Sequence, residues 1–220
     1  MELKYITILD VETTGFDPSS DVVIEIGAIL YSLEFKSTVM EISTLIPVDS
    51  NPAVEVNNIE VGLTQLVNSD MLAGFKQALK AMLDVSSYAV AFNSDFDSSF
   101  LPWINRPWAD AALIQYPRET SKRDLVNLAL NNGIPVVSAH RALTDCRLLA
   151  ELLSKVPNLE EQLTKAARPK QIVRALVSYD QRNLAKQHHF VWNAIVPNAW
   201  ARKMPLEDTQ ELPFQVAVVS

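Results

Sequence analysis

Short apolar runs bounded by turn residues dominate the first 50 residues of the chain, and apolar positions at helical spacing follow them. Short runs favour β-strands, whereas a spacing of three and four residues favours helices with one buried face. The second run carries a single charge, Glu25, and residues 47–58, which contain Pro and Asn, predict a loop. The pattern predicts strands over residues 5–9, 22–31, 38–46 and 88–92, and helices over residues 74–83, 94–103, 123–131 and 142–156.

Strands that precede a mixture of helices and strands indicate an α/β fold with a mixed central sheet flanked by helices. Pro157 and the segment 166–169 bracket a short helical stretch, which suggests a domain boundary. Beyond it, the apolar pattern predicts a small C-terminal α+β appendage of strand, helix and strands. The expected organisation is a main domain over residues 1–156, a linker helix over 157–169 and a small basic and aromatic accessory module over 170–220.

At 220 residues and 48% hydrophobic, the chain suffices for a core of about 150 residues plus a smaller appendage. The amino terminus lacks the basic start and long apolar run of a signal peptide, and no stretch approaches the roughly 18 apolar residues of a membrane span. We therefore expect no membrane partner and a cytoplasmic location. The single cysteine, Cys146, excludes an internal disulfide framework and a Cys-rich zinc site.

The net charge of −7 argues, by itself, against a nucleic-acid partner, because phosphate binding draws on an excess of Lys and Arg. The charge is uneven, however: residues 1–155 hold 11 Lys and Arg against 20 Asp and Glu, whereas residues 156–220 hold 8 against 6. The basic residues of the tail all fall between Lys165 and Lys203, where only Asp180 opposes them. The acidic part therefore needs cations, and the basic segment can meet phosphates.

Candidate chemistry begins at the end of the first expected strand, with Asp10 and Glu12. Because side chains in a strand alternate with a period of two, both carboxylates point to the same face. Carboxylates this close need a positive charge between them, and hard oxygen ligands suit Mg²⁺ or Mn²⁺. The alternative is that Asp10 starts a turn and Glu12 is solvated.

Two further segments carry polar residues where an expected strand or loop leads into a helix. In residues 91–101, Ser94 or Asp95 can cap the helix, with Asp97 in its first turn. In residues 139–150, His140 and Asp145 are five positions apart, which turns them about 140° from each other on a continuous helix. We therefore expect His140 in the preceding loop and Asp145 in the helix, so that both face one site.

These three segments resemble, in the same order, the motifs of the DnaQ-like 3′-to-5′ exonucleases of the DEDDh group, which include polymerase proofreading subunits and exonuclease X. The first, residues 10–16, is Asp-Val-Glu-Thr-Thr-Gly-Phe. The second matches the family's Asn-x-x-Phe-Asp-x-x-Phe-Leu, and the third its His-x-x-x-x-Asp. The resemblance implies a ribonuclease H-like fold, two divalent ions held by the four carboxylates, and a histidine general base. The implied ligands and base are Asp10, Glu12, Asp97 and Asp145, with His140.

The resemblance also implies a reaction and its substrate contacts. One metal lowers the pKa of a bound water, the histidine removes its proton, and nucleoside 5′-monophosphates leave from a nucleic-acid 3′ end. Phe16 is expected to stack on or wedge behind the last base. Asn58 stands where the family has a glycine, which weakens the assignment of its neighbour as a ligand. The expected substrate-binding residues are Thr13, Thr14, Gly15, Phe16, Asn57 and Asn93.

Alternatives remain at this stage. Single-stranded DNA is the favoured substrate and RNA a second one, a polymerase or repair protein is a candidate partner, and the oligomeric state is open. A catalytically idle nucleic-acid-binding subunit on the same fold is expected to have lost a ligand or the base, whereas all five residues are present. In the tail, basic residues interleaved with Tyr179, Phe190, Trp192 and Trp200 predict either a groove for single strands or a small aromatic core with a solvated basic face.

Overall fold

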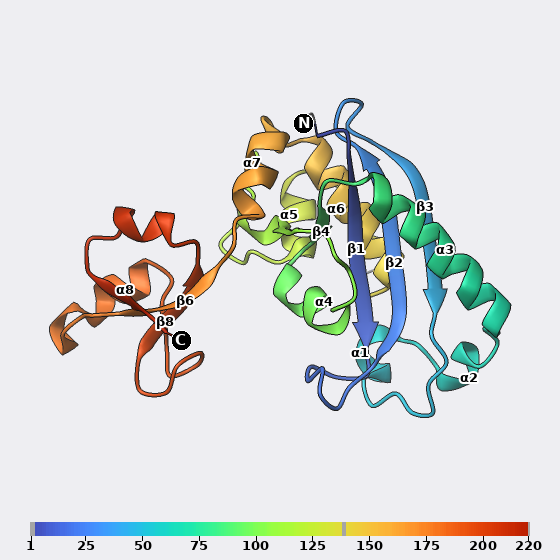
Figure 1. The fold of residues 1–220 in the computed structure, drawn as a ribbon, viewed down its shortest axis with the longest axis horizontal. Helices are drawn as coiled ribbons and strands as arrows, with labels where there is room; N and C mark the ends of the chain where they lie inside the picture. The colour runs from blue at the N-terminus through green and yellow to red at the C-terminus, as the bar shows by residue number, and fades with distance from the viewer. Residues whose placement is uncertain (1–2, 138–139, 220) are drawn as a thin grey trace. The chain divides into compact units, whose positions relative to one another are not determined.

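The computed structural model describes residues 3–137 and 140–219, and the chain forms two compact units, residues 1–167 and 168–220. The first unit contains a five-stranded sheet in the order β3-β2-β1-β4-β5. The first three strands pair antiparallel (Figure 1). β4 runs parallel to β1, and β5 runs parallel to β4. The expected α/β fold with a mixed central sheet is therefore confirmed.

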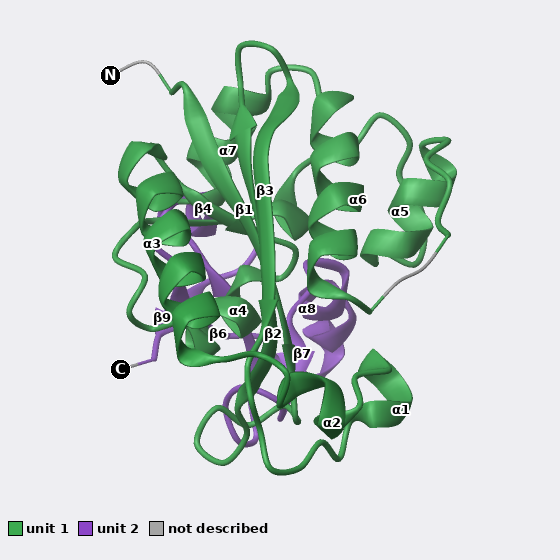
Figure 2. Cartoon of the chain, turned by 90° about the vertical axis from the view of Figure 1, so that its right-hand side faces the viewer, with its two compact units in different colours: residues 1–167 green, residues 168–220 purple. Residues whose placement is uncertain are grey.

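Helices cover both faces of this sheet, with α3 (Ser69–Val85) on one side and α6 (Ala142–Ser154) with α5 on the other (Figure 2). Leu9 and Val11 of β1 (Tyr5–Thr13) pack in the core that contains Phe75 and Leu79 of α3. Ile6 and Ile8, on the opposite face of β1, pack with the Leu-rich face of α6. The alternation along β1 therefore assigns each side chain of that strand to one helix layer.

Most elements of the first unit lie close to their expected positions, but several differ. β1 continues to Thr13 rather than ending at Leu9, because it pairs with β2 along its whole length. The segment expected to be a loop over 47–58 contains a one-turn helix, α1, and neither α2 nor β5 was expected. The remaining elements are β2 (Val23–Ser32), β3 (Ser37–Leu45), α1 (Val54–Asn57), α2 (Val61–Thr64), β4 (Ala89–Ala91), α4 (Ser94–Phe100), β5 (Trp108–Asp110), α5 (Leu125–Asn131) and α7 (Leu159–Ala166).

The second unit is a four-stranded antiparallel sheet in the order β7-β8-β6-β9 with one α-helix, α8, which confirms the expected small strand-rich appendage. Val173, Phe190 and Met204 form the centre of its own small core. None of the helices in the described parts of the chain is long and apolar enough to cross a membrane. The elements of this unit are β6 (Gln171–Ala175), α8 (Arg182–Gln187), β7 (Val191–Trp192), β8 (Trp200–Met204) and β9 (Val216–Val218).

Candidate active site

Three carboxylates meet where β1 passes the start of α6. Asp10 and Glu12 lie within β1 and continue the row of Ile6 and Ile8, so they face the α6 side of the sheet. Asp145 projects from the first turn of α6. One carboxylate oxygen from each of Asp10, Glu12 and Asp145 lies within 4.8 Å of the other two. The geometry therefore brings together three of the four acidic residues as a cluster that can hold a metal ion.

Asp97, the fourth carboxylate, is held at the same strand. It lies in α4, is 2% exposed, and its Oδ1 accepts a hydrogen bond of 3.2 Å from the backbone N–H of Val11, between Asp10 and Glu12 in the sequence.

The expected cap of α4 was wrong: neither Ser94 nor Asp95 caps this helix. The N-cap is Asn93, with a left-handed backbone at φ 69° and no capping side chain. Residue propensity favours Ser or Asp as a cap, but the turn out of β4 requires a left-handed residue here.

His140 precedes α6, and Asp145 lies within the helix, so a loop residue and a helix residue approach the same place. The backbone N–H of His140 donates to Asp145 Oδ2 at 3.3 Å, and the His140 backbone is left-handed, with φ 62°. The imidazole is exposed. Among the described residues, Asp145 Oδ1 is a buried oxygen without a hydrogen-bond partner. This oxygen is therefore available to a cation.

A fifth carboxylate, Glu25, fixes the start of α6, although the sequence interpretation gave it no role. It is 3% exposed and pairs with Arg141 through two hydrogen bonds of 2.8 and 2.9 Å. Its Oε2 also accepts from the backbone N–H of Ala142 at 3.1 Å. The signal was present, because a lone charge in an otherwise apolar, buried strand needs a partner. Glu25 thereby orients the segment that carries His140 and Asp145.

Gly27, two residues further along β2, allows α6 to approach this closely. A Cβ atom at Gly27 would lie 2.5 Å from the backbone of Ala142 and Leu143. Backbone atoms cannot move aside as a flexible side chain can, so any larger residue would displace the helix. The close contact at Gly27 and the ion pair at Glu25 together position the first turn of α6 against the sheet.

Burial raises the pKa values of the three clustered carboxyls and of Asp97. For Asp10, burial and then the charges of the neighbouring carboxylates raise the pKa well above its ordinary value. Burial and the charge of Asp145 raise the pKa of Glu12 to about 7, against the opposing effect of Arg141. Burial also raises the pKa of Asp97 to about 7, although the hydrogen bond from Val11 opposes it, and raises that of Asp145. A cation in the cluster would relieve this unfavourable concentration of negative charge.

The loop after the first carboxylates forms a compact turn that ends in an exposed ring. Thr13 and Thr14 are each 8% exposed, and Thr13 Oγ1 donates to the carbonyl of Gly15 at 2.5 Å. A Cβ atom at Gly15 would collide with the carboxylate of Asp21. Phe16 is 89% exposed, and its ring lies 6.3 Å from that of Phe96. The two threonines and Gly15 therefore shape the turn, and Phe16 is the member that a ligand can reach.

Asn57 lies beneath this turn rather than at its surface. It is 1% exposed, and its amide donates to the carbonyl of Thr13 at 3.3 Å while accepting from Asn51 at 2.9 Å. The burial argues against the expected direct substrate contact and makes Asn57 a support for Thr13. Asn58 adopts φ 55°, so the asparagine that replaces the family's glycine preserves the left-handed turn. Asn93 is exposed at the end of β4, where its N–H donates to Asp110.

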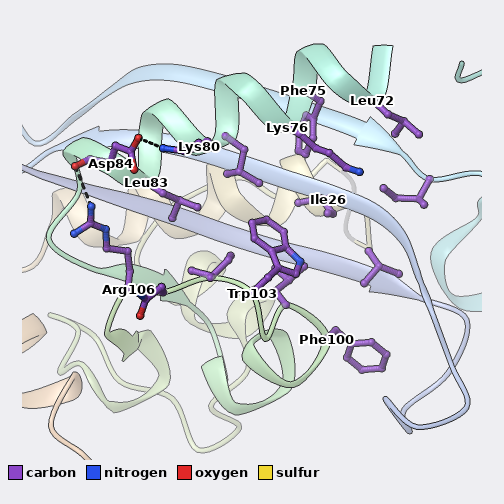
Figure 3. Close-up of a pocket in the computed structure, with 16 residues that line it drawn as sticks. Ile26, Leu72, Phe75, Lys76, Lys80, Leu83, Asp84, Phe100, Trp103 and Arg106 are labelled. Atoms are coloured by element: carbon purple, nitrogen blue, oxygen red, sulfur yellow. Dashed lines mark hydrogen bonds and ion pairs between the residues drawn. The ribbon is translucent and has the colours of Figure 1, made fainter. Parts of the chain in front are cut away.

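A large apolar cavity lies on the other face of the sheet. Its volume is about 800 Å³, and α3 and residues 100–106 form most of its wall. Figure 3 shows Phe75 and Trp103 along it and Lys80 and Arg106 bonded to Asp84 at one end. Because Ile26 lines it from the α3 side of the sheet, the cavity belongs to the layer opposite the carboxylate cluster. It contributes no side chain of that cluster.

Family models and individual relatives both match this chain. A family model described as "Exonuclease" matches residues 7–153, and a domain of unknown function matches residues 171–219. DNA polymerase III subunit epsilon of Treponema pallidum is 31% identical over 166 residues, which cover 67% of this chain and 74% of that protein. The PolC-type DNA polymerase III of Thermotoga petrophila is 29% identical over 172 residues, 71% of this chain but only 12% of the polymerase.

Among solved structures, exonuclease X in complex with 5′ overhanging duplex DNA superposes with a TM-score of 0.56 at 23% identity, covering 74% of this chain and 99% of that one. At this identity the likeness concerns the fold. The exonuclease model, in contrast, spans most of the first unit and every carboxylate of the cluster. The chain therefore belongs to the DnaQ-like exonuclease family.

Proposed function

We propose that the protein is a divalent-metal-dependent 3′-to-5′ exonuclease that releases nucleoside 5′-monophosphates, with single-stranded DNA as the favoured substrate. The observation that carries the proposal is the convergence of Asp10, Glu12 and Asp145 within 4.8 Å. Asp97 is fixed to the same strand by its bond to Val11. Family membership supports the direction of cleavage.

The donor set fits divalent cations of the Mg²⁺ and Mn²⁺ type. All four side chains offer carboxylate oxygens, which such hard ions prefer, and Asp145 Oδ1 is buried without a hydrogen-bond partner among the described residues. Asp10, Glu12, Asp97 and Asp145 would hold two ions. When bound, such ions would supply Lewis acidity, which makes a water molecule a better nucleophile near neutral pH and offsets negative charge on the reacting oxygens.

The chain's own residues position the substrate and move the proton. His140, exposed beside Asp145, is proposed as the general base that takes the proton of the attacking water. The Phe16 ring is proposed to stack on the terminal base, with Phe96 behind it. The turn that carries Phe16 is braced by Asn57 and by Asp21, which accepts from the Asp17 N–H at 2.9 Å. These contacts hold the exposed ring in a fixed turn on which a terminal base can stack.

RNA is the second candidate substrate, and the same mechanism applies to it. DNA is favoured because exonuclease X, one of the similar solved structures, is in complex with DNA, and the sequence relatives are DNA polymerase components. The name of the epsilon relative also supports a polymerase as partner. Competition between matched DNA and RNA strands distinguishes the two substrates, and co-purification with the polymerase tests the partner.

The direct test compares two neighbouring aspartates of α4. Asp97→Asn removes a proposed ligand and should lower the rate of mononucleotide release by at least about 100-fold, since even outer-shell partners of a metal contribute about 10–100-fold. Asp95→Asn makes the same chemical change at an exposed site and should keep the parental rate. Equal rates in the two variants, or activity that persists in a chelator, would refute the proposal.

A further inference from the structure

The second unit contains a pocket formed largely by aromatic side chains. Its volume is about 480 Å³, within the range of about 300–1,000 Å³ that is typical of ligand sites. Trp192 of β7 and Trp200 of β8 are register partners, and their ring centroids are 5.8 Å apart. Because paired strands hold both rings, this side of the pocket is preformed. The lining residues are Val177, Ser178, Tyr179, Arg182, Trp192 and Trp200.

The rings of this pocket are more exposed than the small core of the unit requires. Trp192 is 54% exposed and Tyr179 is 78% exposed, whereas Phe190 of the same unit is 2% exposed. Clustered aromatic surface left in water at a concave site is typical of a binding surface. Of the two interpretations of the tail, the aromatic core therefore accounts for Phe190 but not for Tyr179 and Trp192.

The charges around the pocket select the sign of its ligand. The guanidinium of Arg182 lies 4.0 Å from the centre of the Tyr179 ring, so a cation already occupies one of the two faces of this ring. Lys186 follows one turn along α8 and is exposed. Residues 168–220 hold seven Lys and Arg against four Asp and Glu, whereas residues 1–167 hold 12 against 22. A cationic ligand is disfavoured here, and an anionic ligand with flat rings fits.

We propose that this pocket binds an unpaired base of a single-stranded nucleic acid, stacked on Trp192 and Tyr179, with the adjoining phosphates next to Arg182 and Lys186. Stacking on aromatic rings beside basic side chains is how proteins hold single strands without sequence preference. The proposal rests on the proposed function in taking the nuclease's substrate strand as the ligand. The unit thereby supplies a second contact to that strand, separate from the contact to its terminal nucleotide.

The test measures binding of a fluorescent 20-nucleotide oligothymidylate to the full chain by anisotropy in EDTA. The chelator prevents hydrolysis, so binding is measured on an intact strand and without metal-mediated contacts to its phosphates. Trp192→Ala and Tyr179→Ala should each weaken binding about 5- to 150-fold, because stacking contributes about 1–3 kcal/mol per base. Trp192→Phe keeps a ring and should bind within a few-fold of the parent.

The matched control is Trp103→Ala, which removes an indole of similar exposure, 57%, from the first unit. Parental affinity in both pocket variants, or an equal loss in Trp103→Ala, would overturn the proposal. Pocket variants that bind DNA as tightly as the parent but lose binding to a proline-rich peptide would also overturn it. A parent that binds single strands through the pocket but hydrolyses none with Mn²⁺ supports this inference and refutes the proposed function, so the two can fail separately.

Discussion

Replacement of Glu25 by Gln tests whether the start of α6 is held by a buried ion pair. The carboxylate is 3% exposed and accepts three hydrogen bonds, two from Arg141 and one from Ala142. Breaking a fully buried pair costs about 3–5 kcal/mol, but the Arg141 side chain is 42% exposed, and water can take up its charge. We therefore expect a loss of about 2–3 kcal/mol, which corresponds to a fall in Tm of about 4–12 °C for a chain of this size.

Activity should fall as well, because the segment that carries His140 and Asp145 loses its anchor. A displacement of about 1 Å can reduce catalysis by about 100-fold, so we expect kcat to fall about 10- to 100-fold. The matched control is Glu41→Gln, which breaks a second pair between a strand and α6, with Arg147, at a site where both side chains are exposed. Such pairs contribute at most about 1 kcal/mol. Equal effects of the two substitutions on Tm and kcat would refute the role of Glu25.

Three further changes have defined outcomes. Gly27→Ala should lower Tm and activity, because the added Cβ would lie 2.5 Å from the backbone of α6. The control is Gly74→Ala, where an added Cβ meets nothing within 4 Å; it should stabilise α3 by about 0.5–1 kcal/mol in thermal unfolding. Asn57→Ala should lower the free energy of unfolding by about 1–3 kcal/mol, because it leaves buried hydrogen-bond partners unpaired. Asn58→Gly, at φ 55°, should keep the parental Tm. An unchanged stability of Asn57→Ala would contradict the support that Asn57 gives to the turn. Since the pKa of Glu12 is raised to about 7, the folded chain in EDTA holds more protons than the unfolded chain between about pH 4 and 7. Its Tm should therefore fall as pH rises through that window, and Mn²⁺ should raise Tm more at pH 8 than at pH 5. A Tm in EDTA that is constant across the window would be inconsistent with these shifts.

The sequence allowed much of the fold to be predicted because apolar periodicity reports directly on burial. The strand that contains Glu25 and the helix that carries Asp145 were placed within a few residues of their observed bounds. The resemblance of residues 93–101 to the family's second motif assigned Asp97 rather than Asp95 to the site, and the structure buries Asp97 and leaves Asp95 exposed. Local pattern was sufficient where one side chain's environment depends on its immediate neighbours.

Features that depend on distant contacts were not predictable in this way. Glu25 has its partner 116 residues away, and Gly27 is required only because α6 passes over β2. From the sequence, a buried Asn57 cannot be told from an asparagine that contacts substrate at the surface; only its burial and its hydrogen bond to Thr13 separate the two roles. The left-handed N-cap at Asn93 likewise follows from the exit of β4, which outweighs the capping preference of Ser94. In each case the residue type has several possible roles, and the tertiary structure decides which one it takes.

The most direct measurement is a time course with Mn²⁺ on one single strand, labelled either at its 5′ or at its 3′ end. A nuclease that removes nucleotides from the 3′ end converts a 3′-terminal label to a mononucleotide in the first turnover. The 5′-labelled strand shortens one nucleotide at a time. Early release of the 5′ label as a mononucleotide, internal fragments, or an intact strand after prolonged incubation would contradict the assignment of the carboxylate cluster to 3′-to-5′ hydrolysis.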